Sequence, residues 1–262
     1  MTPAPGLFAA RTEHVGVVAS TMQEAQARAH AGAPHGTTVV AEGQWAGRGR
    51  HGRAWVSAPG AGLFLTTLLR PPPGTNLGGL SLCAGAAVLT AVHRLGATAA
   101  RLKWPNDIWV QGHKLAGVLT ELLPPQGASG GAPAVLVGVG LNLAPKAPPA
   151  LEAEAAAAMP PYVGLWGLCP NVGLTAAARQ VTDALEAAYD AWLSEGLEPT
   201  RQIFARYHAL QGAQVRAQDL GGRAIVGEVL GVAPDGGLVL SVDGQPTTLY
   251  AGEVTRVRPA EP

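Results

Sequence analysis

The segment from Gly47 to Trp55 combines residue types that bind anions. It reads GRGRHGRAW and sets three arginines among three glycines, in a chain whose formal net charge is zero. Glycine lets the backbone approach a ligand closely, and arginine donates forked hydrogen bonds to carboxylate or phosphate. The closing tryptophan can stack on a base. The segment therefore predicts a loop that holds a polyanion.

The three glycines also satisfy the dinucleotide-binding pattern G-x-G-x-x-G, but their surroundings do not. That pattern requires a preceding strand, a following helix and an acidic residue roughly 20 positions further on. Residues 55–60 predict a turn and residues 63–69 another strand, and the first acidic residue after Glu42 is Asp107. We exclude a Rossmann site, and the absence of any G-K-[ST] sequence excludes a Walker-type loop.

A second motif contains two of the three lysines in the chain. It reads KWPNDI from Lys103, followed by HKLAG, which contains Lys114. Arginine supplies the other fifteen positive charges, which indicates that lysine is used here for its chemistry. Its ammonium is a compact point charge that suits one oxygen of a phosphate or carboxylate. Asp107, in the turn of this motif, could assist a magnesium ion or pair with a base or lysine.

Composition and length exclude several classes of protein. The chain has 262 residues, enough for one large domain or for one large and one small domain. It contains no apolar run approaching the roughly 18 residues of a membrane span, and residues 1–14 lack the pattern of a signal peptide. Cys83 and Cys169 lie far apart and resemble small buried hydrophobes of a reducing compartment. The histidines lack metal-ligand spacing, and the balanced charge argues against a nucleic-acid binder. We expect a soluble cytoplasmic enzyme.

Periodicity and turn residues predict the elements that position the two motifs. Thr21 and Glu24 form a capping box that opens a helix ending at Gly32, and a second helix follows the apolar stripe from Leu80 to Leu95. Two further helices, each with a threonine cap, are expected at Thr175–Glu195 and Thr200–Leu210. The expected strands are 37–40, 63–69, 101–104, 108–110, 115–123 and 135–143. Residues 144–173, rich in alanine and proline, are expected to form an irregular connector.

The expected secondary structure changes after Gln211, from helices to a series of short strands. Short strands are expected at 215–217, 224–232, 238–242 and 247–250, with turns at 234–237 and 243–244. Several short strands that close on one another suggest a small β-barrel of about 50 residues. We therefore divide the chain into a large domain, 1–211, and a small domain, 212–262.

Three motifs in a fixed order resemble those of the biotin protein ligases. They are GRGRHGRAW, KWPNDI with the downstream HKLAGVLTE, and VGVGLNL, and the resemblance runs from about Ser20 to Leu143. It implies an α+β fold: a mixed β-sheet with helices packed on it, as in class II synthetases, followed by an SH3-like β-barrel. It also implies an enzyme that activates biotin with ATP to biotinyl-5′-AMP and pyrophosphate. The enzyme then transfers biotin to a lysine of a biotin carboxyl carrier protein of acetyl-CoA carboxylase or a related carboxylase.

The resemblance also implies a set of site residues. Lys114, Arg48 and Arg50 would be catalytic, with Lys114 neutralising the biotin carboxylate and the α-phosphate of ATP. The residues implied to bind biotin are Ser20, Thr21, Met22, Gln44, Arg48, Gly49, Arg50, Lys114 and Gly117. Those implied to bind the nucleotide are Arg50, Arg53, Trp55, Lys103, Asn106, Asp107, Lys114 and Asn142. Asp107 is the candidate ligand of Mg²⁺, which would accompany ATP.

Two positions depart from the family pattern. Met22 stands where asparagine is frequent, which leaves the biotin contact there open. His51 replaces a frequent arginine, so the charge of the loop depends partly on pH. Bifunctional members of the family carry an N-terminal DNA-binding domain, whereas only about 19 residues precede Ser20 here. We therefore expect the monofunctional form, with no DNA and no membrane as partner, and a homodimer is compatible with the resemblance.

Other interpretations of these residues stay open at the level of sequence. Ser20 and Thr21 could simply cap a helix, Trp104 and Trp109 could be core residues, and the glycines of VGVGLNL could mark a bulge or allow a ligand to approach. A lipoate–protein ligase would share the expected fold and the adenylation chemistry. A non-enzymatic nucleic-acid-binding module is disfavoured by the neutral charge balance and by the lack of further aromatic platforms.

Overall fold

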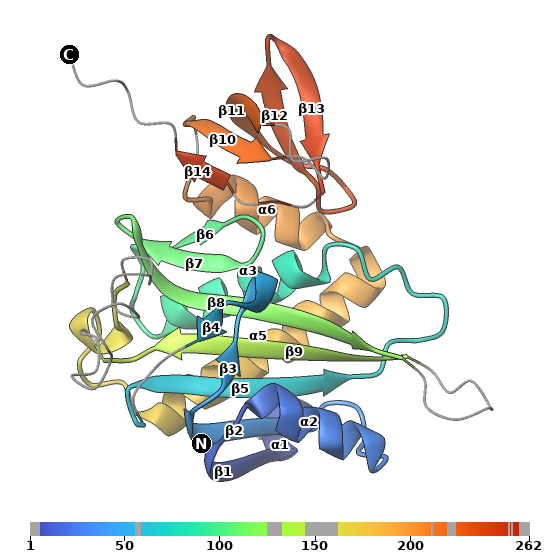
Figure 1. Ribbon diagram of the computed structural model, residues 1–262, viewed down its shortest axis with the longest axis vertical. Coiled ribbons are helices and arrows are strands. Elements are labelled where there is room, and N and C mark those ends of the chain that lie inside the picture. Colours follow the sequence, from blue (N-terminus) through green and yellow to red (C-terminus); the bar gives the residue numbers. More distant parts are fainter. Residues whose placement is uncertain are drawn as a thin grey trace.

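A mixed β-sheet forms the centre of the N-terminal part of the fold. The structure, a computed structural model, describes residues 6–55, 59–124, 133–144, 162–210, 212–218, 224–250, 252 and 254–256. Within these ranges the central sheet has seven strands in the order β1-β2-β5-β9-β8-β7-β6 (Figure 1). β1 and β2 are parallel, and the other neighbouring pairs are antiparallel. The strands are β1 (Thr12–Val18), β2 (Thr38–Gln44), β5 (Gly62–Leu69), β6 (Arg101–Lys103), β7 (Asp107–Val110), β8 (His113–Leu123) and β9 (Ala134–Asn142).

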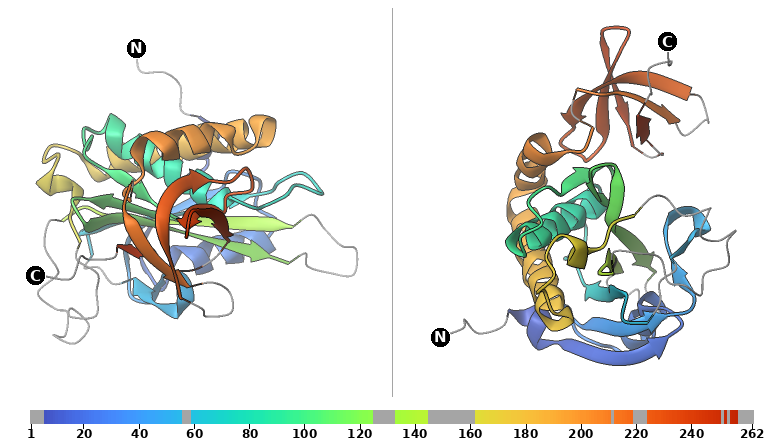
Figure 2. Two further views of the ribbon diagram at one scale, coloured as in Figure 1. Left: turned by 90° about the horizontal axis from the view of Figure 1, so that it is seen from above. Right: turned by 90° about the vertical axis from the view of Figure 1, so that its left-hand side faces the viewer.

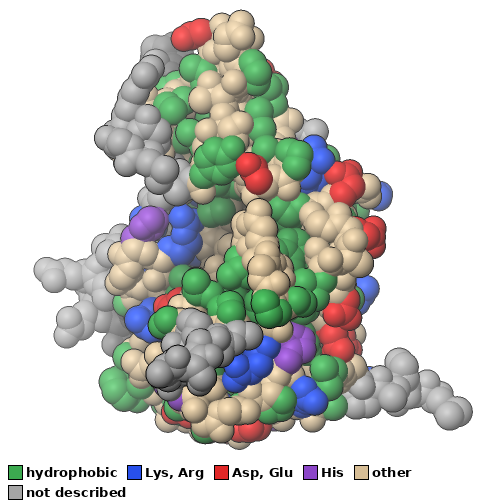
Figure 3. Space-filling view, turned by 90° about the vertical axis from the view of Figure 1, so that its right-hand side faces the viewer, with side chains coloured by type: hydrophobic (Ala, Val, Ile, Leu, Met, Phe, Trp, Pro, Cys, Tyr) green, Lys and Arg blue, Asp and Glu red, His purple; other side chains and the backbone are tan. Residues whose placement is uncertain are grey.

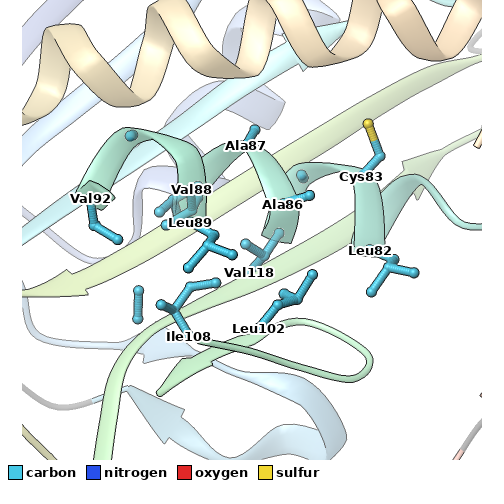
Figure 4. Packing of buried hydrophobic residues seen from close by; sticks show 14 of the residues in the cluster. Leu82, Cys83, Ala86, Ala87, Val88, Leu89, Val92, Leu102, Ile108 and Val118 are labelled. Atoms are coloured by element: carbon cyan, nitrogen blue, oxygen red, sulfur yellow. The ribbon is translucent and has the colours of Figure 1, made fainter. Parts of the chain in front are cut away.

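Helices cover both faces of this sheet (Figure 2). α3 (Leu80–Arg94) and α5 (Leu174–Glu195) lie on one face, with the short α1 (Leu7–Ala10) against α5. α3 is apolar on nearly all sides because it lies between α5 and the sheet. Its side chains pack on Leu102, Ile108 and Val118 (Figure 4). The second face holds α2 (Thr21–His30), which packs through Met22 and Ala25 in a smaller apolar cluster.

A second, smaller sheet follows α6 (Glu198–Tyr207). Its strands are all antiparallel, in the order β13-β12-β11-β10-β14. Figure 3 shows it as a lobe above the main body, with hydrophobic side chains on the face in view. Asp243 and Gly244, both with positive φ, turn the chain between β12 and β13 as a two-residue hairpin requires. The strands are β10 (Gln214–Gln218), β11 (Ala224–Val232), β12 (Leu238–Val242), β13 (Gln245–Leu249) and β14 (Val254–Arg256).

The structure confirms the predicted strands and the helix over 80–95, and it corrects all three predicted caps. Ser20, not Thr21, caps α2: its hydroxyl accepts a hydrogen bond from Met22 N at 3.2 Å. The expected threonine caps of α5 and α6 are also wrong. Gly173 and Leu197 occupy those positions, and neither helix has a side-chain cap. Each predicted threonine lies inside its helix, because the first turn begins earlier than the capping pattern indicated.

Two elements near the N-terminus were not predicted, namely α1 and β1. β1 is an edge strand whose residues are exposed or half-buried, so it lacks the apolar alternation of a half-buried strand. Of the expected connector 144–173, residues 145–161 lie outside the described part, and residues 162–173 contain a short 3₁₀ turn, η2 (Leu165–Gly167). None of the described helices has the length and apolar character needed to cross a lipid bilayer.

Candidate active site

A cavity of about 150 Å³ opens on the face of the central sheet that carries α2. Its walls come from the start of α2, the end of β2, the arginine-rich segment and strands β7, β8 and β9. Every predicted site residue except Lys103 lines it. The predicted residues that it brings together are Ser20, Thr21, Met22, Gln44, Arg48, Gly49, Arg50, Arg53, Trp55, Asn106, Asp107, Lys114, Gly117 and Asn142.

The arginine-rich segment is a short hairpin that lies in front of the sheet (Figure 1). β3 (Gly47–Arg48) pairs with β4 (Ala54–Trp55), and Gly49 N donates to Arg53 O at 2.7 Å. The tip turns through His51 and Gly52, which have φ values of 55° and 71°. Position 47 has no room for a side chain, because a Cβ there would lie 2.6 Å from the carbonyl oxygen of Trp55. The hairpin thus carries its arginines to the rim of the cavity.

Glycines of β8 and β9 form the floor on which Trp55 lies. Gly117 and Gly140 are register partners, and a Cβ on Gly140 would lie 2.5 Å from the Trp55 ring. A Cβ on Gly138 would lie 2.7 Å from Met22 Sδ. The pairing of β9 runs through both of its glycines without a register shift, so they allow close approach and do not form a bulge. The indole Nε1 of Trp55 is buried and has no hydrogen-bond partner within the described residues, which leaves a donor at the cavity.

A chain of hydrogen bonds fixes the polar end of the cavity. The Thr66 hydroxyl donates to the Thr21 hydroxyl at 2.9 Å, and the Thr21 hydroxyl donates to Gln44 Oε1 at 3.1 Å. Thr21 N also donates to Gln44 Oε1, at 2.7 Å. Because these two donors take the amide oxygen, the Gln44 NH₂ group is the part left to face a ligand. Thr21 therefore orients Gln44 and does not cap its helix.

Lys114 and Asp107 form an ion pair in the cavity wall. Lys114 Nζ lies 2.7 Å from Asp107 Oδ1, and the two side chains are 19% and 21% exposed. The ammonium also lies 5.2 Å from the centroid of the Trp55 ring. Asp107 pairs with Gly117 on β8, and a register shift next to it brings Lys114 opposite Trp109. The β7–β8 pairing thus sets the position of both charges.

The side-chain amides of Asn106 and Asn142 donate hydrogen bonds to backbone carbonyl groups next to this ion pair. Arg50 Nη1 donates to Asn106 Oδ1 at 3.2 Å, and Asn106 Nδ2 donates to Val118 O. Asn142 Nδ2 donates to the Lys114 carbonyl oxygen at 3.1 Å. At the rim, Arg48 Nη2 lies 3.5 Å from Glu121 Oε2. Among the described residues that line the cavity, four are basic and Asp107 alone carries a carboxylate, so the site favours an anionic ligand.

Some cavity residues were not predicted, and Lys103 lies elsewhere. The Lys103 ammonium is 4.1 Å from the centroid of the Trp109 ring and outside the cavity lining. Tyr162 was missed because no motif surrounds it: it reaches the cavity by bridging to Lys114, and burial raises the pKa of its hydroxyl. The other missed residues lie within the three sequence motifs, and the pairing of β3 with β4 and of β8 with β9 decides which of them face the cavity. They are Ala54, Val118, Leu119 and Val139, together with Gly138 and Gly140, whose role the sequence left open.

Comparison with known proteins identifies the family. Residues 15–142 match the biotin/lipoate A/B protein ligase family. A biotin–[acetyl-CoA-carboxylase] ligase of Mycobacterium tuberculosis is 34% identical over 249 residues, which cover 91% of this chain and 86% of that protein. This chain belongs to the biotin protein ligases. The resemblance indicated by the three motifs is confirmed.

Other biotin protein ligases agree in sequence and in fold. The bifunctional ligase/repressor BirA of Escherichia coli is 34% identical over 229 residues, covering 86% of this chain and 68% of that protein. The biotin protein ligase of Aquifex aeolicus, solved in complex with biotin and ATP, superimposes with a TM-score of 0.77 at 24% identity. That superposition covers 95% of this chain and 99% of the other. The predicted combination of a mixed sheet with packed helices is therefore the fold of this family.

Proposed function

We propose that this biotin protein ligase activates biotin with ATP to biotinyl-5′-AMP, releases pyrophosphate, and transfers biotin to a lysine of a biotin carboxyl carrier protein. It is a ligase of the biotin–[acetyl-CoA-carboxylase] class. One observation carries the proposal: the arginine hairpin and the Lys114–Asp107 pair face the same cavity over a floor of glycines. The first step brings two anions together, and a cavity lined by fixed positive charge reduces their repulsion.

We infer different tasks for the two ends of the cavity. At the polar end, Ser20, Thr21 and Gln44 hold the uncharged head of biotin, with Met22 and the glycine floor along its apolar part. At the charged end, Lys114, Arg48 and Arg50 meet the biotin carboxylate and the α-phosphate. The binding residues proposed around these two ends are Gly49, Arg53, Trp55, Asn106, Asp107, Gly117 and Asn142.

The chemical step needs positioning and charge, and no group of the enzyme forms a covalent bond in it. A carboxylate oxygen of biotin attacks the α-phosphorus, and the bond from that phosphorus to the bridging oxygen of pyrophosphate breaks. Lys114 neutralises charge on both reactants, while Asp107 holds its ammonium at 2.7 Å. The lysine amine of the carrier then attacks the acyl carbon, and AMP leaves.

Mg²⁺ fits this site as an ion bound mainly by the phosphates of ATP, and not as an ion held by protein ligands alone. The described residues bring no three His, Cys, Asp or Glu side chains together, and the carboxylate of Asp107 is already bound to Lys114. Mg²⁺ commonly uses one or two carboxylates together with substrate phosphates. Asp107 is therefore at most one ligand, and no step is assigned to the metal.

We also propose the division of the chain into a catalytic domain, 1–211, and a C-terminal domain, 212–262. The central sheet ends before α5, and the five-stranded sheet begins at Gln214. The order β13-β12-β11-β10-β14, with a register shift between Val229 and Gly231, suits an SH3-like barrel, in which bulges bend the strands. Cytoplasmic location and assembly as a homodimer complete the proposal.

A pyrophosphate-release assay tests this function. We expect release only when biotin, ATP and magnesium are all present, with each omitted in turn as a control. Calorimetric titration with biotin and with lipoate separates this activity from that of a lipoate–protein ligase. Heat with lipoate alone would refute the biotin assignment, and pyrophosphate release that does not depend on biotin would refute the ligase reaction.

A further inference from the structure

Trp109 lies next to the ion pair of the active site. In β7, Asp107 and Trp109 are half-buried and alternate with the buried Ile108 and Val110. Side chains two residues apart in a strand project from the same face, so Trp109 shares the face of Asp107. Trp109 does not line the cavity, and its neighbour across the β7–β8 pairing is Lys114. It is therefore placed to act on the cavity through these two residues.

Each oxygen of the Asp107 carboxylate has a different partner. Lys114 Nζ lies 2.7 Å from Oδ1, whereas the indole Nε1 of Trp109 donates to Oδ2 at 3.5 Å. The aspartate χ2 torsion has broad, shallow minima, so a single ion pair leaves the carboxylate free to rotate. A second donor on the other oxygen restricts that rotation and keeps Oδ1 toward Lys114.

Lys103 contacts the face of the Trp109 indole ring. Its ammonium is 4.1 Å from the centroid of the Trp109 ring, and Lys103 pairs with Asp107 across the β6–β7 hairpin. A cation over the face of an indole is attracted by the ring quadrupole. The cation also draws electron density from the ring, which makes the N–H a better donor to the carboxylate. The four side chains form one sequence of contacts: Lys103, Trp109, Asp107 and Lys114.

We infer that Trp109 is a positioning residue for Lys114. It fixes the Asp107 carboxylate from outside the cavity, and Lys103 fixes Trp109 in turn. The inference rests on the proposed function, in which Lys114 meets the biotin carboxylate and the α-phosphate. The contact of Lys103 with Trp109 would give this lysine a role in the site although it lies outside the cavity. That role explains its place in the same motif as the cavity residues Asn106 and Asp107.

The kinetic test uses Trp109→Phe, which keeps an aromatic ring for Lys103 and removes the N–H. We expect kcat for pyrophosphate release to fall roughly three- to tenfold, the effect of losing one hydrogen bond of ordinary net strength, while KM for biotin stays within about twofold. Trp45→Phe is the matched control, because Trp45 is 75% exposed and outside the cavity lining. Lys103→Gln should lower kcat in the same direction, whereas Lys103→Arg should restore it by keeping a cation over the ring.

A spectroscopic test reads the contact itself, without any activity. The ¹H–¹⁵N indole resonance that disappears in Trp109→Phe belongs to Trp109, and it should move upfield in Asp107→Ala and in Lys103→Gln. An unmoved resonance in Asp107→Ala would overturn the inference, and so would an unchanged kcat in Trp109→Phe. If the wild-type protein released no pyrophosphate with biotin, the proposed function would fail while the resonance still decided whether Trp109 holds Asp107.

Discussion

The indole N–H of Trp104 donates a hydrogen bond to the carbonyl oxygen of Gly236 at 3.0 Å. Trp104 belongs to the β6–β7 hairpin that carries Asn106 and Asp107, and Gly236 lies in the turn between β11 and β12. The same turn packs closely on the start of α3, because a Cβ on Gly236 would lie 2.8 Å from Gly79 Cα. The small sheet is therefore attached to the hairpin that carries Asp107, one partner of the ion pair in the cavity.

Removing this hydrogen bond should loosen the small sheet. Trp104 is 4% exposed and Gly236 is half-buried, so Trp104→Phe leaves the Gly236 carbonyl without its partner in a partly desolvated place. We expect a loss of about 1–3 kcal/mol in the free energy of unfolding, measured by urea titration. Limited proteolysis should also cut the variant sooner between the two sheets. Trp45→Phe, at an exposed position, serves as the control; equal stability of the two variants would contradict the prediction.

Lys114→Ala and Arg50→Gly should damage adenylate formation or retention and leave folding nearly unchanged. Both side chains line the cavity and neither belongs to an apolar cluster. Loss of one group that stabilises developing charge commonly lowers kcat by about 10²–10³-fold. The measurement is biotinyl-AMP formation with a single turnover of ATP, with the thermal midpoint as the folding control. Wild-type formation and retention by either variant would disprove the assignment.

Gly140→Ala should displace Trp55 from the cavity floor. The added methyl carbon would lie 2.5 Å from the indole ring, so the hairpin that carries the arginines has to move. We expect biotin affinity to fall roughly tenfold or more, because a displacement at a binding wall disturbs every contact that depends on it. Gly16→Ala is a matched strand control, since a Cβ there meets nothing within 4 Å. Calorimetry with biotin compares the two, and equal affinities would count against a floor that requires glycine.

Stability should fall as pH drops below about 6.5. Burial is the main cause that lowers the pKa of His35 and of His208 from the ordinary value of 6.5. Below that value the unfolded chain binds protons that the folded chain does not, so the free energy of unfolding decreases as pH falls. His35 Nδ1 also accepts a hydrogen bond from Arg70 N at 3.0 Å, which requires an unprotonated nitrogen.

His208→Phe should flatten this pH dependence. His208 stacks on Phe204 with ring centroids 4.7 Å apart, so a phenyl ring keeps the packing and removes the titrating group. Urea titrations at several pH values between 7.5 and 5.5 measure the slope. A slope in His208→Phe as steep as in the wild type would show that His208 is not one of its sources.

The sequence predicted the site residues more completely than the contacts between them. GRGRHGRAW and HKLAG contain unusual residue types at short spacing, so Arg50 and Lys114 could be selected without a structure. Thr66 and Tyr162 could not, because a threonine in an apolar strand and a tyrosine after a proline-rich stretch carry no local signal. Their positions follow from the pairing of β5 with β9 and from the bridge to Lys114.

The caps show the same limit on a smaller scale. Ser20, Thr175 and Thr200 all fit the residue preference of a helix start, but only Ser20 caps a helix. The other two helices begin earlier, and Gly173 and Leu197 occupy their N-cap positions. A short polar pattern can therefore indicate that a helix is near, whereas the helix itself can begin one or two residues away from that pattern.

The cavity collects residues that are far apart along the chain, from Ser20 to Tyr162. No local fragment contains the site, so it comes into existence only when the whole central sheet has assembled. Any ligand of the cavity thus binds the folded chain and not the unfolded one, and mass action links occupancy to folding. A ligand at a hundredfold its Kd would add about 2.7 kcal/mol to the stability of the chain. The supply of ligand then sets the fraction of the enzyme that is folded, as well as how fast it works.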